Sequence, residues 1–326
     1  MEDKRVLVIG IGRHARANIY PALAQASAQI EAVASRHRQD AAAFAQGLGA
    51  DVRAYGDHRQ MLEQENAKRV VVVTQGPETV AVVADCLAAG RTVFAEKPLG
   101  LSAAQAQKIV SAAAASGGAV QVGFMKRYAP CYQMLRERIA AGDYGPVRSF
   151  RFTFDVSAAA FCRTDRDFIY YVAIHGLDLM RYLFGEITQT AAFKNGAGSG
   201  ASYQVLLRTE SGCTGSCGFE NRAAHTLEQE RLEVTFEDGY ACAENLGSLL
   251  LRRAGTGDWR ELGESERRFS ATLNPGSGAA RDLYLRGFAQ EMQRFLSDEA
   301  ADGSADNLRT AQLCDAILAD IGAYNS

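Results

Sequence analysis

The sequence predicts an α/β domain followed by an α+β domain with a mostly antiparallel, open sheet. Through the first third of the 326 residues, short apolar runs alternate with amphipathic helical stretches, a pattern typical of a parallel sheet built from crossover units. Later runs are joined by hairpin signals such as Ser211-Gly212 and Asp238-Gly239, which indicate an antiparallel sheet. The composition, 47% hydrophobic and 22% charged, fits a globular chain of about two domains, which we place at residues 1–123 and 124–326.

Five apolar runs are the expected strands of the first domain: Val6–Ile9, Ile30–Ala34, Val70–Val73, Thr92–Ala95 and Ala119–Gly123. Helices are expected between them, over much of Arg13–Ala26, Thr79–Ala89 and Ala103–Ala115. Pro21 lies beyond the first turn of the first helix, where a proline removes a backbone hydrogen bond and crowds the preceding turn. We therefore expect that helix to kink or to restart at Pro21.

The second domain is expected to begin with a helix over Tyr128–Ala141 and a long strand over Val147–Val156. Apolar residues occupy every second position of that strand, which predicts one buried face. A helix over Val172–Phe184 precedes the antiparallel strands. Near the end of the chain, apolar residues at spacings of three and four predict one face of a single helix: Leu285, Phe288, Ala289, Met292, Phe295 and Leu296. A last helix is expected over Asn307–Tyr324.

Charge and cysteine content narrow the classes of partner. The formal net charge is -3 and lysines and arginines are not clustered, so neither nucleic acid nor an anionic membrane is an expected partner. No apolar run is long enough to span a bilayer. The seven cysteines are scattered, which favours reduced thiols in a cytoplasmic protein. Cys213 and Cys217 are the closest pair, but no second pair lies nearby, so we expect no metal site.

The first motif with chemical content is a G-x-G-x-x-A sequence at residues 10–15, which ends the first strand and opens the first helix. Gly10 and Gly12 permit a tight turn and a close approach of the backbone to a pyrophosphate, while the helix N-terminus offers N–H groups and a partial positive charge. The motif predicts a dinucleotide-binding Rossmann domain. Arg13 is expected over the diphosphate or in solvent, and His14 on the surface.

The end of the second strand distinguishes NAD from NADP, because an acidic side chain there bonds a ribose 2′-hydroxyl and a basic one favours a 2′-phosphate. Ser35-Arg36-His37-Arg38 stands at that place, whereas Glu31 falls at the start of the strand, too far from the ribose. We expect NADP, with Ser35 and Arg36 on the phosphate and Arg38 assisting. NAD, with a solvated basic loop, is the alternative.

Three parts of the chain together carry a family resemblance: Gly10-Ile11-Gly12, the stretch Ala88–Leu99 with Glu96-Lys97-Pro98 near its end, and His175. Over essentially its full length the chain resembles the glucose-fructose oxidoreductase and inositol dehydrogenase (Gfo/Idh/MocA) family. The resemblance implies a Rossmann domain, a second domain on a mostly antiparallel open sheet, and a nicotinamide in the cleft between them. It also implies a nicotinamide-dependent oxidoreductase of sugars, polyols or keto-sugars that forms homodimers or homotetramers through the open sheet.

The resemblance also assigns roles to single residues. Lys97 corresponds to the lysine beside the nicotinamide and the substrate, and Glu96 helps to hold the nucleotide. His175 resembles the histidine of a second signature, commonly D-x-x-x-H on a helix, although Tyr171 replaces the aspartate. In an α-helix Tyr171, His175 and Asp178 share one face, so Tyr171 and Asp178 are expected at the substrate. An imidazole with an ordinary pKa of about 6.5 takes or gives a proton near neutral pH, so Lys97 and His175 are the expected catalytic pair.

The loop after Val70–Val73 departs from the family pattern of Thr-Pro followed by a histidine. This chain has Thr74-Gln75-Gly76-Pro77-Glu78-Thr79, with Thr79 at the histidine's place. The residues expected to line the cofactor there are Thr74, Gln75 and Pro77. Lys126 and Arg127 follow the last strand of the first domain and are expected to orient substrate hydroxyls or an acidic group. The alternative for both is an exposed hinge.

Two other functions stay open. A nucleotide-binding protein that senses or regulates without turnover would account for the departures at Tyr171 and Thr79, but it gives no chemical reason for Lys97 and His175. A lyase or glycosidase that oxidises and then re-reduces one sugar carbon would use the dinucleotide transiently. Such an enzyme would show no net change in cofactor absorbance.

Overall fold

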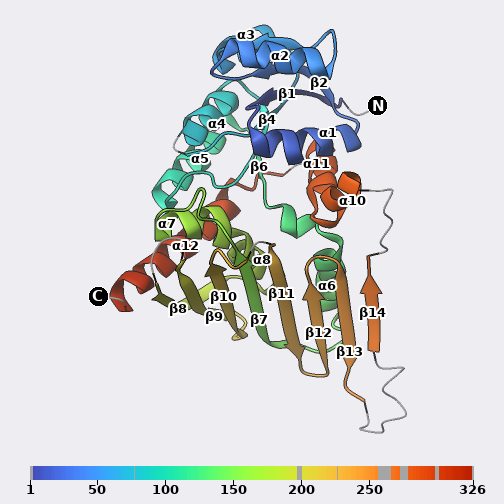
Figure 1. The fold of residues 1–326 in the computed structure, drawn as a ribbon, viewed down its shortest axis with the longest axis vertical. Helices are drawn as coiled ribbons and strands as arrows, with labels where there is room; N and C mark the ends of the chain where they lie inside the picture. Colours follow the sequence, from blue (N-terminus) through green and yellow to red (C-terminus); the bar gives the residue numbers. More distant parts are fainter. Residues whose placement is uncertain are drawn as a thin grey trace. The chain divides into compact units, whose positions relative to one another are not determined.

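The computed structural model describes residues 3–76, 78–196, 200–225, 227–255, 266–271, 278–297 and 301–324. The chain divides into two compact units, one comprising Met1–Met125 and Gly287–Ala311, the other Lys126–Arg286 and Gln312–Ser326. Each unit is built on one sheet (Figure 1). The α/β class expected for the first unit and the α+β class expected for the second are confirmed. No helix within the described ranges is long and apolar enough to cross a membrane.

The first unit contains a six-stranded parallel sheet in the order β3-β2-β1-β4-β5-β6. Its strands are β1 (Arg5–Ile9), β2 (Gln29–Ala34), β3 (Arg53–Tyr55), β4 (Arg69–Val72), β5 (Thr92–Ala95) and β6 (Val120–Val122). Five of these strands match the expected apolar runs, whereas the three residues of β3 offer none. The strand order reverses between β1 and β4, and ligands of open parallel sheets bind beyond the carboxyl ends of the strands at such a point.

The helices that join these strands are η1 (Ala15–Ile19), α1 (Tyr20–Gln25), α2 (Arg38–Leu48), α3 (His58–Gln64), α4 (Glu78–Ala88) and α5 (Ala103–Ser116). A kink or a restart was expected at Pro21; the helix instead continues without a break and changes there from the π-helical η1, which ends at Ile19, to α1, with Pro21 in its first turn. At that position the missing N–H of a proline removes no bond within the new helix. Helix α2 was not expected; it buries only Ala41 and Ala45, so its sequence carries no strong apolar stripe.

The chain returns to the first unit near its C-terminal end. Helix α11 (Phe288–Leu296) packs on the sheet, and the rings of Phe94 and Phe295 lie 5.7 Å apart. The single helix expected from Leu285 onward is wrong at its start, because α10 (Gly278–Leu285) ends there and Gly287, with φ of 94°, separates it from α11. Nothing in the local composition marks the return of this segment, and the expected division at residue 123 did not anticipate it.

The second unit holds an eight-stranded sheet in the order β14-β13-β12-β11-β7-β10-β9-β8 (Figure 1). Among the described pairings, β7 with β10 is parallel and the others are antiparallel. The strands are β7 (Val147–Val156), β8 (Ile187–Asn195), β9 (Ser202–Thr209), β10 (Thr214–Asn221), β11 (Gln229–Phe236), β12 (Gly239–Glu244), β13 (Ser248–Arg253) and β14 (Glu266–Ser270). Phe150, Phe152 and Phe154 of β7 are buried while Arg151 is exposed, so the expected single buried face is confirmed.

Helical segments of the second unit are η2 (Met125–Tyr128), α6 (Pro130–Ala141), α7 (Asp165–Phe168), η3 (Ile169–Ala173), α8 (Ile174–Phe184) and α10. The last helix, α12 (Ser304–Tyr324), begins three residues before the expected start and ends at the expected residue. Its final part belongs to the second unit, where Asp315 accepts hydrogen bonds from Arg166 and from the Tyr170 hydroxyl, each at 2.9 Å.

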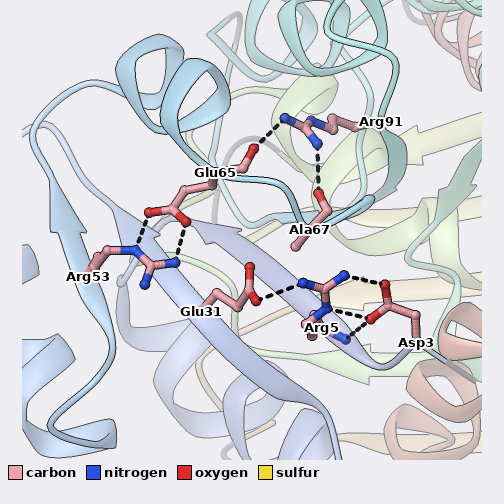
Figure 2. A network of polar contacts seen from close by, with 7 residues as sticks. All are labelled: Asp3, Arg5, Glu31, Arg53, Glu65, Ala67 and Arg91. Carbon is pink, nitrogen blue, oxygen red and sulfur yellow. Dashed lines mark hydrogen bonds and ion pairs between the residues drawn. The ribbon is translucent and has the colours of Figure 1, made fainter.

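Ion pairs connect residues at the amino ends of the strands of the first sheet, here called its amino edge (Figure 2). Arg5, the first residue of β1, pairs with Asp3 at 2.8 Å and with Glu31 of β2 at 3.3 Å. Arg53, the first residue of β3, holds the buried Glu65 carboxylate through two nitrogens, and this pairing lowers the pKa of Glu65. Glu31 is thus engaged at the amino edge, in keeping with the expectation that it lies too far from a bound ribose.

Arg91 extends the same network (Figure 2). Its guanidinium donates to the carbonyl oxygens of Leu62 at 2.8 Å, Glu65 at 2.7 Å and Ala67 at 3.0 Å. The charged groups drawn there are matched to one another or to backbone carbonyls. The amino edge therefore serves the fold, and the carboxyl edge is the place to look for a ligand.

Candidate functional site

The glycine turn at the end of β1 is fixed by a close backbone contact. Gly10 has φ of 108°, and a Cβ added there would lie 2.1 Å from the carbonyl oxygen of Val73. Its N–H donates to the Ala34 carbonyl at 2.9 Å, and the Val73 N–H donates to the Ile9 carbonyl at 2.8 Å. Only glycine fits this position, and the turn is anchored between the ends of β2 and β4.

Gly12 faces open space at the start of the helix. It is exposed, and a Cβ added there would meet no heavy atom within 4 Å. The Gly12 carbonyl accepts from Arg16 N at 3.0 Å, so the helical turn begins here and its first N–H groups have no acceptor within the helix. Arg13 is exposed on that turn. This bare, donor-rich surface fits the pyrophosphate of a dinucleotide.

The basic segment after β2 lies beside the glycine turn. Ser35 N–H donates to the Tyr55 carbonyl at 3.1 Å, which fixes the exit of the strand. The Arg36 side chain is 81% exposed, and its nearest carboxylate in the first unit is Glu78, 3.5 Å away. Arg38, exposed at the start of α2, lies with its stem against Gly56, where an added Cβ would come within 3.1 Å. The guanidinium of Arg36 is therefore accessible to an anionic ligand.

The loop after β4 carries Thr74 and the exposed Gln75. Pro77, expected to line the cofactor, lies outside the described residues. Thr79, which stands where the family pattern has a histidine, is fully buried, and its hydroxyl lies 2.9 Å from the Thr74 hydroxyl. Thr79 thus links the first turn of α4 to Thr74, which follows β4.

Glu96 follows β5 and joins two parts of the carboxyl edge. Its carboxylate is buried, 5% exposed; Oε1 lies 3.0 Å from His14 Nε2, and Oε2 accepts the Lys97 N–H at 3.2 Å. The carboxyl group packs against Gly123, where an added Cβ would lie 3.0 Å from it. The His14 side chain, expected on the surface, is 42% exposed, and its ring also bonds the Asn18 amide at 3.0 Å. Lys97 itself is partly buried beyond this link.

In the second unit, the position of His175 is set by the packing of its helix, α8, on the sheet. It is the second residue of α8 and is partly buried. Gly176 packs directly on β7: a Cβ added there would lie 2.3 Å from the buried Phe152 ring. The absence of a side chain at Gly176 lets the first turn of α8 approach the sheet and sets the depth of His175.

The helix that carries these residues is not α-helical throughout. Expected as one α-helix over Val172–Phe184, it is α-helical from Ile174, and Ile169–Ala173 form the π-helical η3. Tyr171 lies in η3, so the α-helical spacing that was expected to align it with His175 and Asp178 does not hold for it. Tyr171 is partly buried, and burial, with the nearby Asp167 charge, raises the pKa of its phenol.

Arg127 and Asp178 form a bidentate ion pair within the second unit. Arg127 Nε lies 2.7 Å from Asp178 Oδ2, and its Nη2 bonds the other oxygen. Asp178 is 1% exposed and sits one turn after His175 in α8, so the expected contact of its carboxylate with substrate is replaced by this pair. The Arg127 guanidinium also lies 5.1 Å from the Tyr182 ring centroid. A substrate contact by Arg127, whose side chain is 19% exposed, remains a prediction.

The expectation that Lys126 contacts substrate is wrong. Its side chain is 4% exposed and its ammonium pairs with Glu230, which also accepts from the Tyr132 hydroxyl. The ammonium lies 4.8 Å from the Phe154 ring centroid. This buried cluster fastens the start of the second unit to β11 and leaves no charge for a ligand.

No metal centre is found in the described part of the chain. No group of three or more His, Cys, Asp or Glu there is placed to hold a metal ion. The seven cysteines are free and buried, and burial raises the pKa of the Cys213 and Cys217 thiols. These thiols are packed as small apolar side chains.

Two family models match the chain. Residues 4–124 match the model described as oxidoreductase family, NAD-binding Rossmann fold. Residues 132–242 match the GFO/IDH/MocA C-terminal domain. The two matched segments together cover well over half of the sequence.

Curated relatives include an inositol 2-dehydrogenase of Rhizobium meliloti, 26% identical over 96% of this chain and 96% of its own length. A D-apiose dehydrogenase of Paraburkholderia graminis is 29% identical over 71% of this chain and 65% of that enzyme. A trans-1,2-dihydrobenzene-1,2-diol dehydrogenase of Mus musculus is 34% identical over 40% of this chain. That match spans only 39% of the mouse enzyme.

Solved structures with the same architecture include a dehydrogenase from Chromobacterium violaceum, with a TM-score of 0.85 and 18% identity over 98% of this chain and 96% of that chain. A levoglucosan dehydrogenase in complex with NADH and L-sorbose gives a TM-score of 0.83 at 18% identity, over 99% of this chain and 98% of its own. At these identities the likeness establishes the fold.

The packing of Gly176 of α8 against β7 gives a first prediction. Gly176→Ala is expected to lower the free energy of unfolding by about 1–3 kcal/mol, because the methyl group must displace a buried ring. Gly322→Ala is the control: it lies in α12, and an added Cβ there meets nothing within 4 Å, so no loss of stability is expected. Urea unfolding of both variants measures the difference, and equal midpoints would contradict the packing described for α8.

Proposed function

Because the chain belongs to the Gfo/Idh/MocA oxidoreductase family, we propose that it is a nicotinamide-dependent oxidoreductase that transfers hydride to or from one carbon of a sugar, polyol or keto-sugar. The observation that carries the proposal is the position of Lys97 just beyond β5, where its backbone N–H donates to the buried Glu96 carboxylate. The phosphate-binding turn of Gly10 and Gly12 lies at the same edge of the same sheet. A dinucleotide bound on that turn supplies the hydride acceptor or donor.

The remaining chemistry is proton transfer, and we assign it to Lys97 and His175. Oxidation of an alcohol releases its hydroxyl proton together with hydride transfer, so a base must take that proton, and the reverse reaction needs an acid. A lysine side chain polarises the reacting oxygen, and an imidazole takes or returns the proton near neutral pH. The Tyr171 phenol, kept protonated near neutral pH because burial raises its pKa, is assigned a hydrogen bond to a substrate hydroxyl.

The substrate class rests on the names of the relatives. They are dehydrogenases of inositol, of D-apiose and of a 1,2-diol of dihydrobenzene. Each name describes a molecule with neighbouring hydroxyl groups. A polyhydroxylated substrate, oxidised at one carbon, is therefore our assignment for this chain.

NADP is the cofactor we assign, with NAD as the alternative. Arg36 supports NADP, because its largely exposed guanidinium follows β2, where the 2′-phosphate of a bound NADP lies. Ser35, with Arg38 at the start of α2, would assist it. The levoglucosan dehydrogenase neighbour was solved with NADH, but at 18% identity it does not decide the preference of this chain.

Cofactor selection is tested by fluorescence titration with NADPH and NADH. The wild-type protein is expected to bind NADPH more tightly. Arg36→Ala is expected to weaken NADPH by about tenfold or more, the effect of a lost hydrogen bond between charged groups, and to leave NADH unchanged. Arg59→Ala is the control, since it removes an exposed arginine of the same unit that pairs with Asp85. Tighter binding of NADH by the wild type would overturn the NADP assignment.

The catalytic assignment predicts the behaviour of Lys97→Ala and His175→Ala. Each is expected to lower kcat by about 10²–10⁴-fold in a screen of polyols and keto-sugars, while the dinucleotide dissociation constant stays close to that of the wild type. Lys108→Ala, on the exposed side of α5, is the control and should keep full activity. A wild-type rate in either variant would refute that residue's role, and substrate conversion without net absorbance change would favour the lyase or glycosidase alternative.

We also propose that the chain forms a homodimer or homotetramer through the open face of the second sheet. A hollow of about 690 Å³ lies on this face, with Arg151 and Glu233 among its lining residues. Leu206 and Phe193 are 55% and 49% exposed there. A face that carries apolar groups and both charge signs can meet a second copy of itself across a two-fold axis.

The oligomer is tested by light scattering at fixed protein concentration. The wild type is expected to have the mass of a dimer or tetramer. Leu206→Glu places two like charges at such an interface and should reduce the mass, whereas Leu48→Glu, a comparable exposed leucine of the first unit, should not. A wild-type mass of one chain would refute the proposal.

A further inference from the structure

The imidazole of His14 links two strand ends that do not neighbour each other in the first sheet. His14 follows β1, Glu96 follows β5, and β4 lies between these strands. Strands in a sheet are spaced by about 4.8 Å, so the two strand ends are about 10 Å apart. The contact of 3.0 Å between His14 Nε2 and Glu96 Oε1 closes this distance with a single side-chain pair.

The ring of His14 is held in one orientation. The Asn18 amide, one turn further along the helix, lies 3.0 Å from Nδ1, and the Phe288 ring packs 5.9 Å away at an interplanar angle of 60°. With Nδ1 accepting from that amide, the single proton of a neutral imidazole lies on Nε2. His14 therefore presents an N–H donor to the Glu96 carboxylate.

Glu96 needs that donor. Its side chain is 6% exposed, and a buried carboxylate is stable only when hydrogen bonds replace the water it has lost. The carboxyl group also packs against Gly123, where an added Cβ would lie 3.0 Å from it. The same carboxylate accepts the Lys97 N–H at 3.2 Å, so the rotamer that His14 stabilises is the one that holds the turn bearing Lys97.

We propose that His14 is a positioning residue for Lys97. It acts through Glu96 and couples the start of the phosphate-binding helix to the turn that carries the amine. A dinucleotide that orders the glycine turn thereby also orders Lys97. The catalytic consequence rests on the function proposed above, whereas the placement of Lys97 does not.

Three substitutions of His14 test this link. Leucine has a similar volume and no donor. Asparagine and glutamine both carry an amide, but only glutamine places its nitrogen near the position of Nε2. His14→Gln is therefore expected to rescue what His14→Leu and His14→Asn lose. His58→Leu is the matched control, because His58 bonds Asp85 at 2.9 Å in the same unit and that pair does not involve the Lys97 turn.

The first measurement needs no turnover. The chain has six lysines, so after reductive ¹³C-methylation the dimethylamine resonance of Lys97 is assigned by its loss in Lys97→Ala. In His14→Leu and His14→Asn this resonance is expected to shift or broaden, and in His14→Gln to return to the wild-type position. His58→Leu should leave it in place even if the melting temperature falls.

The second measurement is steady-state kinetics with the substrate that the screen identifies. His14→Leu and His14→Asn are expected to lower kcat by about tenfold with little change in the substrate KM, and His14→Gln to restore it. An unmoved Lys97 resonance in both His14→Leu and His14→Asn, or an equal shift in His14→Gln or His58→Leu, would overturn the proposal. If the wild type turns over no substrate, the proposed function fails while the resonance still decides the role of His14.

Discussion

The contact of Gly10 with the Val73 carbonyl is the constraint on which the carboxyl edge of the first sheet depends. A side chain at this position would place its Cβ 2.1 Å from the oxygen, so the chain turns there with φ of 108°. The turn starts the first helix directly beyond β1 and brings its free N–H groups to the edge where Ser35 and Thr74 also leave their strands. Because Val73 continues β4, the same contact fixes the loop that begins at Thr74. Recognition of a dinucleotide and placement of His14 both follow from this single backbone approach.

The distribution of charge separates groups that serve the fold from groups that can serve a ligand. At the amino edge of the first sheet, Arg53 is matched to a buried carboxylate, and in the second unit Lys126 and Arg127 are matched in the same way. Buried ions need such partners, since an unpaired charge in the interior costs several kcal/mol. Arg36 differs from them, because it is 81% exposed and its carboxylate partner lies 3.5 Å away. Exposure and partner distance, more than residue type, are therefore what supports Arg36 as the cation that we propose for the cofactor phosphate.

Much of the fold could be predicted because its signals are local. Periodic apolar runs located five strands of the first sheet, and the lack of an N–H on Pro21 pointed to the place where the first helix changes from η1 to α1. The elements that escaped prediction are those set by distant contacts, such as the return of α11 to the first unit and the π-helical η3. The residues that stabilise these elements lie far away in the sequence, so the local spacing of apolar residues does not predict them.

In the candidate site, too, the features set by local sequence could be predicted and those set by distant contacts could not. Gly10 and Gly12 were located by a motif whose glycines are required by the backbone itself. Lys126 was misassigned because its partner, Glu230, lies 104 residues away in sequence. The role of His14 was missed for the same reason, since Glu96 lies 82 residues further along the chain. A histidine in the first turn of the glycine-motif helix, together with a glutamate that directly follows a strand of the same sheet, was the signal that the sequence offered.

The two departures from the family pattern, at Thr79 and at Tyr171, differ in their consequences for the chemistry. Thr79 is fully buried and its hydroxyl contacts that of Thr74, so it adds no charged or titratable group. Tyr171 changes the chemistry, because an aspartate would carry a negative charge near neutral pH and a phenol with a raised pKa does not. A neutral hydroxyl can orient a substrate hydroxyl, but it cannot stabilise an imidazolium as a carboxylate does. In the mechanism that we propose, the loss of that carboxylate gives Lys97 a larger share of the proton transfer, so a fixed position for Lys97 matters correspondingly more.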